Sequence, residues 1–264
     1  MAMLILLVLL IFFAALGIPL AFAIGASCVT YILIYAPTFI TMLPQRVWNG
    51  AYSELMIAMP LFMLAGELMN TGGITQRIIN FCMELLRPVR GGLGEVNIVA
   101  SMIFGGISGS ASADTASLGS ILIPMMVDQG YDGDFSTAVT ITSSCEGLLV
   151  PPSHNMVIYA TTAGGISVGS LFLAGYVPGA LLAASLMVGS YIISVKRNYP
   201  KGDKFSMKNL LKQLSVSFWA LAAVLIVVFG VVGGVFTATE SAAVAVIYSL
   251  IVSVFIYKGL DWKG

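Results

Sequence analysis

One run of small polar residues could bind an ion, and it lies between two apolar stretches. It reads FGGISGSASADTASLGS over residues 104–120 and contains four glycines, five serines and Asp114. Hydroxyls and carbonyls freed by glycine suit a hard cation, and free N–H groups at helix starts suit a carboxylate. Close packing of small residues is the alternative. It explains the glycines but neither the hydroxyls nor Asp114, whose burial in a bilayer would be costly.

A second polar interruption lies in residues 140–167, TITSSCEGLLVPPSHNMVIYATTAGGIS. Gly147, Pro151 and Pro152 break this apolar segment, and the prolines leave upstream carbonyls without helical partners. Polar side chains gather around the break, at Ser143, Ser144, Glu146, Ser153, His154 and Asn155. A structural role stays open for His154, by bonding a freed carbonyl or lying at a pore mouth. Glu146 is open to two interpretations, a paired or water-exposed carboxylate and a proton carrier.

The composition indicates an all-α polytopic membrane protein. Of 264 residues, 58% are hydrophobic and only 9% are charged, and the mean hydropathy is +0.98. The twelve basic and twelve acidic residues balance without a long basic run, which argues against a nucleic-acid partner. Cys28, Cys82 and Cys145 occur singly, so neither a disulfide framework nor a zinc site is expected.

The elements that position these residues follow from the length of the apolar segments, since a spanning helix needs about 20 residues. Spans are predicted at 2–25, 27–43, 54–70, 136–162, 169–195, 215–233 and 240–257. Gly17 and Pro19 offer an earlier first division. The amphipathic segments 74–92 and 205–214 predict helices that lie in the membrane interface.

The serine-rich run is predicted to form the tip of a re-entrant helical hairpin. Its apolar flanks, 94–103 and 118–127, are about ten residues each, which covers only half of the membrane. The tip, from Gly109 to Asp114, would then lie near the midplane. Irregular backbone at that depth needs protein or a water-filled cavity to satisfy its polar groups.

Basic residues in the connections predict the orientation. Residues 196–212 carry six basic residues and Lys258 and Lys263 follow, whereas residues 233–241 carry none. The loop 196–214 and the C-terminus of this chain are therefore expected in the cytoplasm, with the N-terminus outside. Arg46, in a predicted external loop, disagrees mildly.

Four blocks together resemble the large membrane subunit of tripartite ATP-independent periplasmic (TRAP) transporters, the DctM-type family. They are GGISGSASADTASLGSILIPMM, LLVPPSHNMVIYA, GGISVGSLFLAGYVPGALLA and GGVFTATESAAVAVIYSLIVSVFIYKGL. The resemblance implies an inverted-repeat secondary transporter of the inner membrane, an elevator with re-entrant hairpins and broken helices, and not an enzyme. It implies sodium-coupled import of a carboxylate or sialic-acid-type compound, with sodium as the coupling ion and no other cofactor. The implied partners are a small four-span membrane subunit and a periplasmic binding protein.

The matching positions give a candidate ion and substrate site within the region 93–168. Its residues are Ser108, Gly109, Ser110, Ser112, Asp114, Thr115, Ser144, Gly147, Pro151, Pro152, Ser153, His154 and Asn155. Sodium is expected at Ser108, Ser110, Ser112 and Gly147. Residues 1–92 would be scaffold spans with an interfacial helix. Residues 169–264 would hold further spans and the start of the second repeat.

The family's large subunit is usually longer, with a second inverted half. This chain ends at Gly264, so it is expected either to be truncated at its C-terminus or to need a separate chain to complete the site, and not to transport by itself. The main alternative is a stand-alone sodium-dependent dicarboxylate carrier of another hairpin-containing family. An ATP-driven pump is disfavoured because GxxxxGK[ST] is missing. A channel would need a continuous polar path, and a hydrolase using Ser153 and His154 would lack an acid to orient the histidine.

Overall fold

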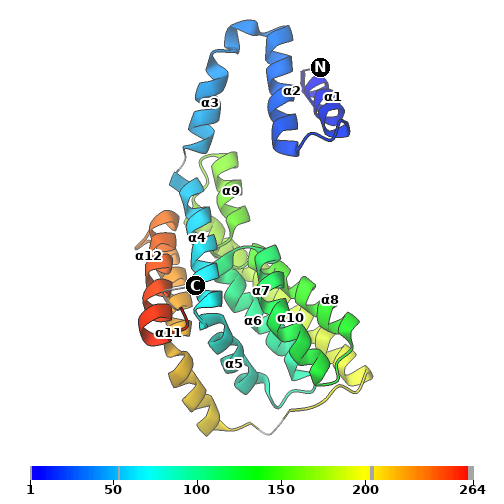
Figure 1. Cartoon of the computed structure of the whole chain (residues 1–264), viewed down its shortest axis with the longest axis vertical. Coiled ribbons are helices and arrows are strands. Elements are labelled where there is room, and N and C mark those ends of the chain that lie inside the picture. Colours follow the sequence, from blue (N-terminus) through cyan, green and yellow to red (C-terminus); the bar gives the residue numbers. More distant parts are fainter. Residues whose placement is uncertain (1, 53, 203–204, 261–264) are drawn as a thin grey trace. The chain divides into compact units, whose positions relative to one another are not determined.

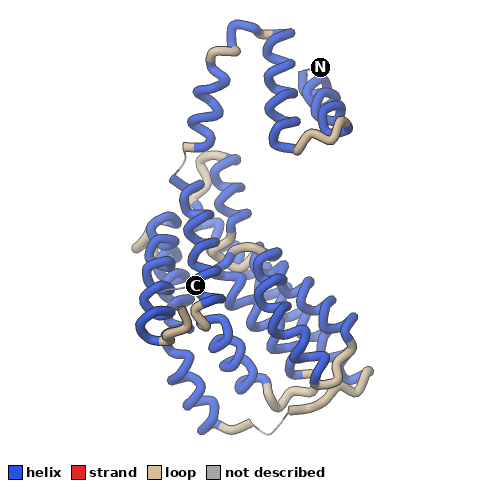
Figure 2. Tube along the Cα trace, viewed as in Figure 1, coloured by secondary structure: helices blue, strands red, loops and turns tan. Residues whose placement is uncertain are grey.

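The computed structural model describes residues 2–52, 54–202 and 205–260, which form helices joined by short connections with no β-strand (Figure 2). Three helices in this part are long and apolar enough to cross a membrane, and a bent pair would make a fourth. The chain is therefore helical and has the composition and helix lengths of a polytopic membrane protein. It divides into two compact units, Met1–Ser53 and Glu54–Gly264.

The first unit contains α1 (Ala2–Ala15), α2 (Leu20–Tyr35), a short 3₁₀ turn (Pro37–Phe39) and α3 (Met42–Ala51). The predicted spans 2–25 and 27–43 are wrong in their boundary, which lies at residues 16–19. Gly17 turns the chain there with a φ of 80°, and Pro19 is the N-cap of α2. These two residues decide the division because neither supports a continuous helix.

The second unit begins with α4 (Glu54–Thr71) and α5 (Ile74–Leu86), which meet at an angle of 68°. Gly73, with a φ of 76°, allows the bend. Helix α5 buries Ile74, Ile78 and Cys82 in a core shared with α6 and α11. It ends at Leu86, earlier than the predicted helix 74–92.

The serine-rich run lies in a helical hairpin formed by α6 (Gly92–Ser108) and α7 (Ala111–Asp128) (Figure 1). The prediction of ten-residue legs is wrong, because these helices have 17 and 18 residues. Gly109, with a φ of 62°, ends α6, and the Ser110 hydroxyl caps α7 by accepting a bond from Ala113 N. Asp114 therefore lies in the first turn of α7 rather than in irregular backbone.

The physical reason is that hydroxyl groups of the run form hydrogen bonds with backbone carbonyls of their own helix. Thr115 Oγ1 donates to Ala111 O at 2.9 Å, and Ser120 Oγ donates to Ser117 O at 2.8 Å. Alanine is also the best helix former, and three alanines lie among these serines. The outer ends of the hairpin meet, since Leu93 N donates to the Tyr131 hydroxyl at 3.3 Å.

The predicted break is present. Helix α8 (Gly133–Ser144) passes into a 3₁₀ turn, η2 (Cys145–Leu148), and α9 (His154–Ala163) begins only after both prolines. Helix α10 (Val168–Lys196) follows, close to the predicted span 169–195. The chain between Leu148 and His154 thus leaves its helical path where the sequence indicated.

The C-terminal helices are α11 (Met207–Val232) and α12 (Ala238–Ile251), which continues as a π-turn (Val252–Ile256). The separate interfacial helix predicted at 205–214 is wrong, because these residues form the start of α11. Ser206 caps the helix, and no glycine or proline interrupts it until Gly230. A single helix is the result that local propensity favours.

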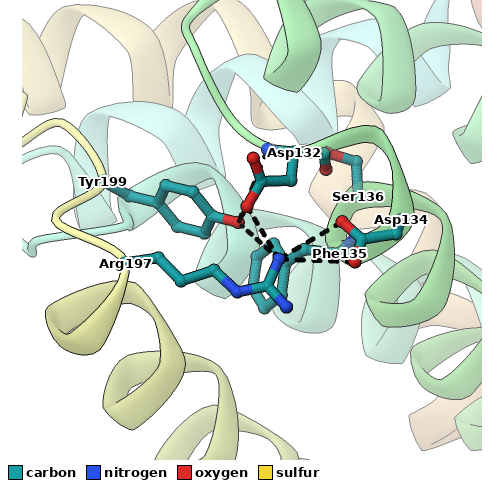
Figure 3. A network of polar contacts seen from close by, with 6 residues as sticks. All are labelled: Asp132, Asp134, Phe135, Ser136, Arg197 and Tyr199. Atoms are coloured by element: carbon teal, nitrogen blue, oxygen red, sulfur yellow. Dashed lines mark hydrogen bonds and ion pairs between the residues drawn. The ribbon is translucent and has the colours of Figure 1, made fainter.

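A polar network joins the start of α8 to the end of α10 (Figure 3). The Asp132 carboxylate accepts bonds from Arg197 Nη1 and the Tyr199 hydroxyl, each at 2.7 Å. Arg197 Nη1 also donates to Asp134 at 3.2 Å. Arg90 Nε, just before α6, donates to Tyr199 O at 3.2 Å. Ion pairs and hydrogen bonds therefore join the connections around the outer ends of the hairpin.

The network predicts a stability that depends on pH. Asp132→Asn should lower the midpoint of thermal unfolding by about 2 °C or less at neutral pH, because the pair is exposed. Hydrogen bonds from Tyr199 and Arg197 lower the pKa of the Asp132 carboxyl. Its stabilising effect is therefore complete above the ordinary pKa of about 4 and is lost as pH falls through the lowered folded-state pKa. The difference between wild type and variant should vanish at acid pH.

Thermal unfolding of both proteins across a pH series measures this difference. Asp128→Asn, an exposed acid at the end of α7 outside the network, is the matched control and should match wild type throughout. A difference that persists unchanged into strong acid would contradict the assignment.

Candidate ion and substrate site

The tip of the hairpin packs directly on the broken segment. A methyl carbon added at Gly105 would lie 2.5 Å from Gly147 Cα, closer than atoms can approach. One added at Gly106 would lie 3.1 Å from Pro151 O, and one at Gly109 would lie 3.0 Å from His154 N. Glycine is therefore required for two backbones to meet here.

Asp114 is fully buried at this contact. Its Oδ1 accepts a hydrogen bond from Ser108 Oγ, whereas its Oδ2 has no hydrogen-bond partner in the described part of the chain. Oδ2 lies against the backbone of the two glycines, 2.8 Å from the Cβ position of Gly105 and 2.7 Å from that of Gly147. A carboxylate oxygen, a serine hydroxyl and backbone from the break thus gather at one point.

Glu146, on the other side of Gly147 from Leu148, is also fully buried. Neither of its carboxylate oxygens has a hydrogen-bond partner among the described residues. The two acids thus bring two buried carboxyl groups to η2, and three of their four oxygens have no hydrogen-bond partner in the described part of the chain. Such an arrangement favours a positively charged ligand or a proton.

Two helices begin beside this contact. Helix α7 starts at Ala111 and α9 starts at His154, and Gly109 lies against the first N–H of α9. The N-terminal ends of helices carry a partial positive charge and free N–H groups, which favour an anion such as a carboxylate. The same region can therefore serve a cation through oxygens and a carboxylate through N–H groups.

The remaining predicted site residues differ in their exposure and in their hydrogen-bond partners. Ser112 is exposed, and its hydroxyl lies 3.2 Å from that of Ser110. Ser144 Oγ donates to Thr140 O and Ser153 Oγ donates to Leu148 O, both at 2.8 Å. Asn155 is exposed. Residues close to Asp114 or to the hairpin tip are Ser108, Gly109, Gly147, Pro151, Pro152 and His154.

His154 is half-buried, and its imidazole lies beside the backbone of Met59 on α4. Its Nε2 has no hydrogen-bond partner in the described residues. Gly66 of α4 approaches Ser108 as well, with 3.4 Å between its Cβ position and Ser108 Cα. Helix α4 therefore covers the tip and the break from one side.

A row of buried hydrogen bonds between α6 and α8, here called the polar seam, lies behind the site and was not predicted from the sequence. Asn97 Nδ2 on α6 donates to Thr140 Oγ1 on α8 at 2.7 Å, and Ser143 Oγ donates to Asn97 Oδ1 at 3.2 Å. Ser101 Oγ lies 2.9 Å from Ser143 Oγ. The spacing of residues 97, 101, 105 and 108 on one face of a helix was the signal that could have revealed it.

The glycine contact gives a direct test of the packing. Gly105→Ala should lower the free energy of unfolding by about 1–3 kcal/mol, because the new methyl group overlaps Gly147 Cα. Thermal or denaturant unfolding measures the change. Gly189→Ala in α10, where nothing lies within 4 Å of the Cβ position, is the control and should be neutral or stabilising. Equal behaviour of the two variants would show that hairpin and break do not touch.

Comparison with known proteins supplies the family. The model of the tripartite ATP-independent periplasmic transporter DctM component matches residues 7–264. The sialic acid TRAP transporter permease protein SiaT of Haemophilus influenzae is 40% identical over 94% of this chain and 40% of its own length. The C4-dicarboxylate TRAP transporter large permease protein DctM of Vibrio cholerae is 37% identical over 98% of this chain and 57% of its own. The chain thus spans about half the length of the curated relatives it matches, and it belongs to the DctM family of TRAP transporter components.

Proposed function

We propose that this chain provides the first hairpin and first broken helix of a sodium-coupled TRAP large permease that imports an organic acid. The observation that carries this proposal is the contact of the hairpin tip with the break around buried Asp114. Hairpin tips and broken helices supply the ion and substrate sites of secondary transporters. The names of the relatives, which specify sialic acid and C4-dicarboxylates, support an organic acid as cargo.

The proposed assembly follows the family. The permease would lie in the inner membrane of a bacterium or archaeon, together with a small four-span subunit and a periplasmic binding protein that delivers the acid. It would transport its cargo without enzymatic chemistry. The six basic residues of 196–212 support a cytoplasmic position for the α10–α11 connection and a re-entrant hairpin that opens to the same side.

The residues of the site have separable roles in this mechanism. Asp114 and Ser108 would offer oxygens to sodium, together with backbone near Gly147. The N-terminal ends of α7 and α9 would face the carboxylate of the cargo. An ion bound by both hairpin and break favours the conformation in which the two meet, so ion binding prepares the substrate site. The second half of the permease would complete the cavity from the opposite side, as inverted repeats do.

Sodium dependence of uptake tests the ion site. In the full-length permease with its small subunit and binding protein, Asp114→Asn should raise the sodium concentration for half-maximal uptake by about tenfold or more. Ser108→Ala should raise it in the same direction, because each variant loses one oxygen ligand. Uptake of labelled substrate into proteoliposomes against external sodium gives the value.

Ser120→Ala is the matched control, since this exposed serine on α7 donates to Ser117 O within its own helix. It should leave the sodium requirement unchanged. If Asp114→Asn and Ser108→Ala kept the sodium requirement of wild type, the ion assignment would be lost. Uptake without a binding protein would instead favour a stand-alone dicarboxylate carrier.

Cysteine labelling tests the orientation and the re-entrant hairpin. With Cys28, Cys82 and Cys145 replaced, Gln129→Cys and Lys201→Cys should react with membrane-impermeant reagent only from the cytoplasmic side. Val235→Cys, in the connection between α11 and α12, should react only from outside. All three side chains are exposed. Labelling of Gln129→Cys and Val235→Cys from the same side would refute this topology.

A further inference from the structure

A second buried acid lies at the opposite end of α6 from Ser108. Glu95, in the first turn of α6, is 2% exposed, and its Oε1 has no hydrogen-bond partner in the described residues. Thirteen residues of helix, about 20 Å, separate it from Ser108. The proposed function therefore makes no use of Glu95.

Two serine hydroxyls of α10 share this position. Ser190 and Ser194 lie one turn apart and are 4% and 0% exposed, and neither hydroxyl has a hydrogen-bond partner within the described part of the chain. The Ser190 hydroxyl lies beside the Glu95 carboxylate. It is within hydrogen-bonding reach of that carboxylate, and Glu95 Oε1 and the Ser194 hydroxyl keep their bonding capacity in the described part of the chain.

The two hydroxyls do not bond to their own helix. Serines such as Ser144 and Ser185 donate to a carbonyl one turn earlier in their own helix, each at 2.8 Å. Ser190 and Ser194 face α6 instead. The Cβ position of Gly94 lies 2.7 Å from Ser190 Oγ, and that of Gly91 lies 2.1 Å from Ser194 Oγ. The two glycines thus make room for hydroxyls directed at the start of α6.

Among the described residues, no base forms an ion pair with the Glu95 carboxylate. Arg90, the basic residue nearest in sequence, donates to Tyr199 O at 3.2 Å and to Asn198 Oδ1 at 3.3 Å. Tyr131, which also faces Glu95, carries no positive charge. Burying an ionised carboxylate without a partner is costly, so a proton or a cation must accompany it.

We propose that Glu95, Ser190 and Ser194 bind a small monovalent cation between α6 and α10. A proton would engage one carboxylate oxygen, whereas a cation engages the carboxylate and both hydroxyls. Oxygen ligands with a single negative charge suit a hard monovalent ion. The described residues hold no cluster of three or more His, Cys, Asp or Glu side chains, which disfavours a transition metal. This ion fastens the outer end of the hairpin to α10.

Cation-dependent thermal stability tests the site separately from transport. The full-length permease carrying Asp114→Asn is purified in detergent and melted in series of sodium, potassium and choline chloride at constant ionic strength. This background weakens the proposed hairpin site. We expect a saturable rise of several degrees in the unfolding midpoint with sodium relative to choline. Adding Glu95→Gln should raise the sodium concentration at half-effect at least tenfold.

The combined Ser190→Ala and Ser194→Ala variant should weaken the sodium effect in the same way, and it keeps the test decisive if Glu95→Gln fails to fold. Ser185→Ala on the same helix is the matched control and should leave the effect intact. A sodium effect that is absent, or that survives loss of Glu95 and of both serines, overturns the proposal. Because this test measures unfolding and the earlier one measures uptake, failure of the Glu95 site and failure of the Asp114 site are distinguishable.

Discussion

The contact of the hairpin tip with the broken segment is the constraint on which this unit depends. Backbone freed from helices inside a membrane must find partners within the protein or in a water-filled cavity, because lipid offers none. The chain meets this requirement by bringing the tip, at Gly109, onto the break after Leu148. The approach is possible only because Gly105 and Gly147 lack side chains where they meet. The glycines are therefore required for this backbone contact, and the hydroxyls and Asp114 supply the oxygens of the proposed site.

The fold around that contact makes the hairpin and the break a single body. Asn97 and Ser101 of α6 bond to Thr140 and Ser143 of α8 along a buried seam. Bonds between buried polar groups add little net stability, but leaving any of them unpaired would be expensive, so they fix one register of α6 on α8. The proposed transport mechanism would need this rigidity, since a site shared by two elements survives movement only if both move together.

The sequence predicted the interruption well and the helix lengths poorly. Pro151, Pro152 and Gly147 act through local backbone chemistry, so the end of α8 and the start of α9 could be read from residue types alone. The secondary structure of the serines around Asp114 could not be predicted from residue type, because serine occurs both in turns and in buried helices. The seam through Asn97 depends on which faces of α6 and α8 pack together. The serines beside Glu95 lie on α10, nearly a hundred residues later in the sequence, so sequence position alone could not indicate this contact.

Helix α6 therefore contacts a different element at each end. Its C-terminal end meets the break at Gly105, and its N-terminal end meets α10 at Gly91 and Gly94, with a buried acid beside each contact. Glycine brings the backbones close in both places, and each contact has a carboxylate oxygen without a hydrogen-bond partner among the described residues. Ions at the two ends would act on different partners of one rigid helix, the break in one case and α10 in the other. In the proposed elevator mechanism, an outer ion would enlarge and stiffen the moving body if α10 moved with the hairpin. If α10 instead stayed with a fixed scaffold, the same ion would have to leave before the hairpin could move.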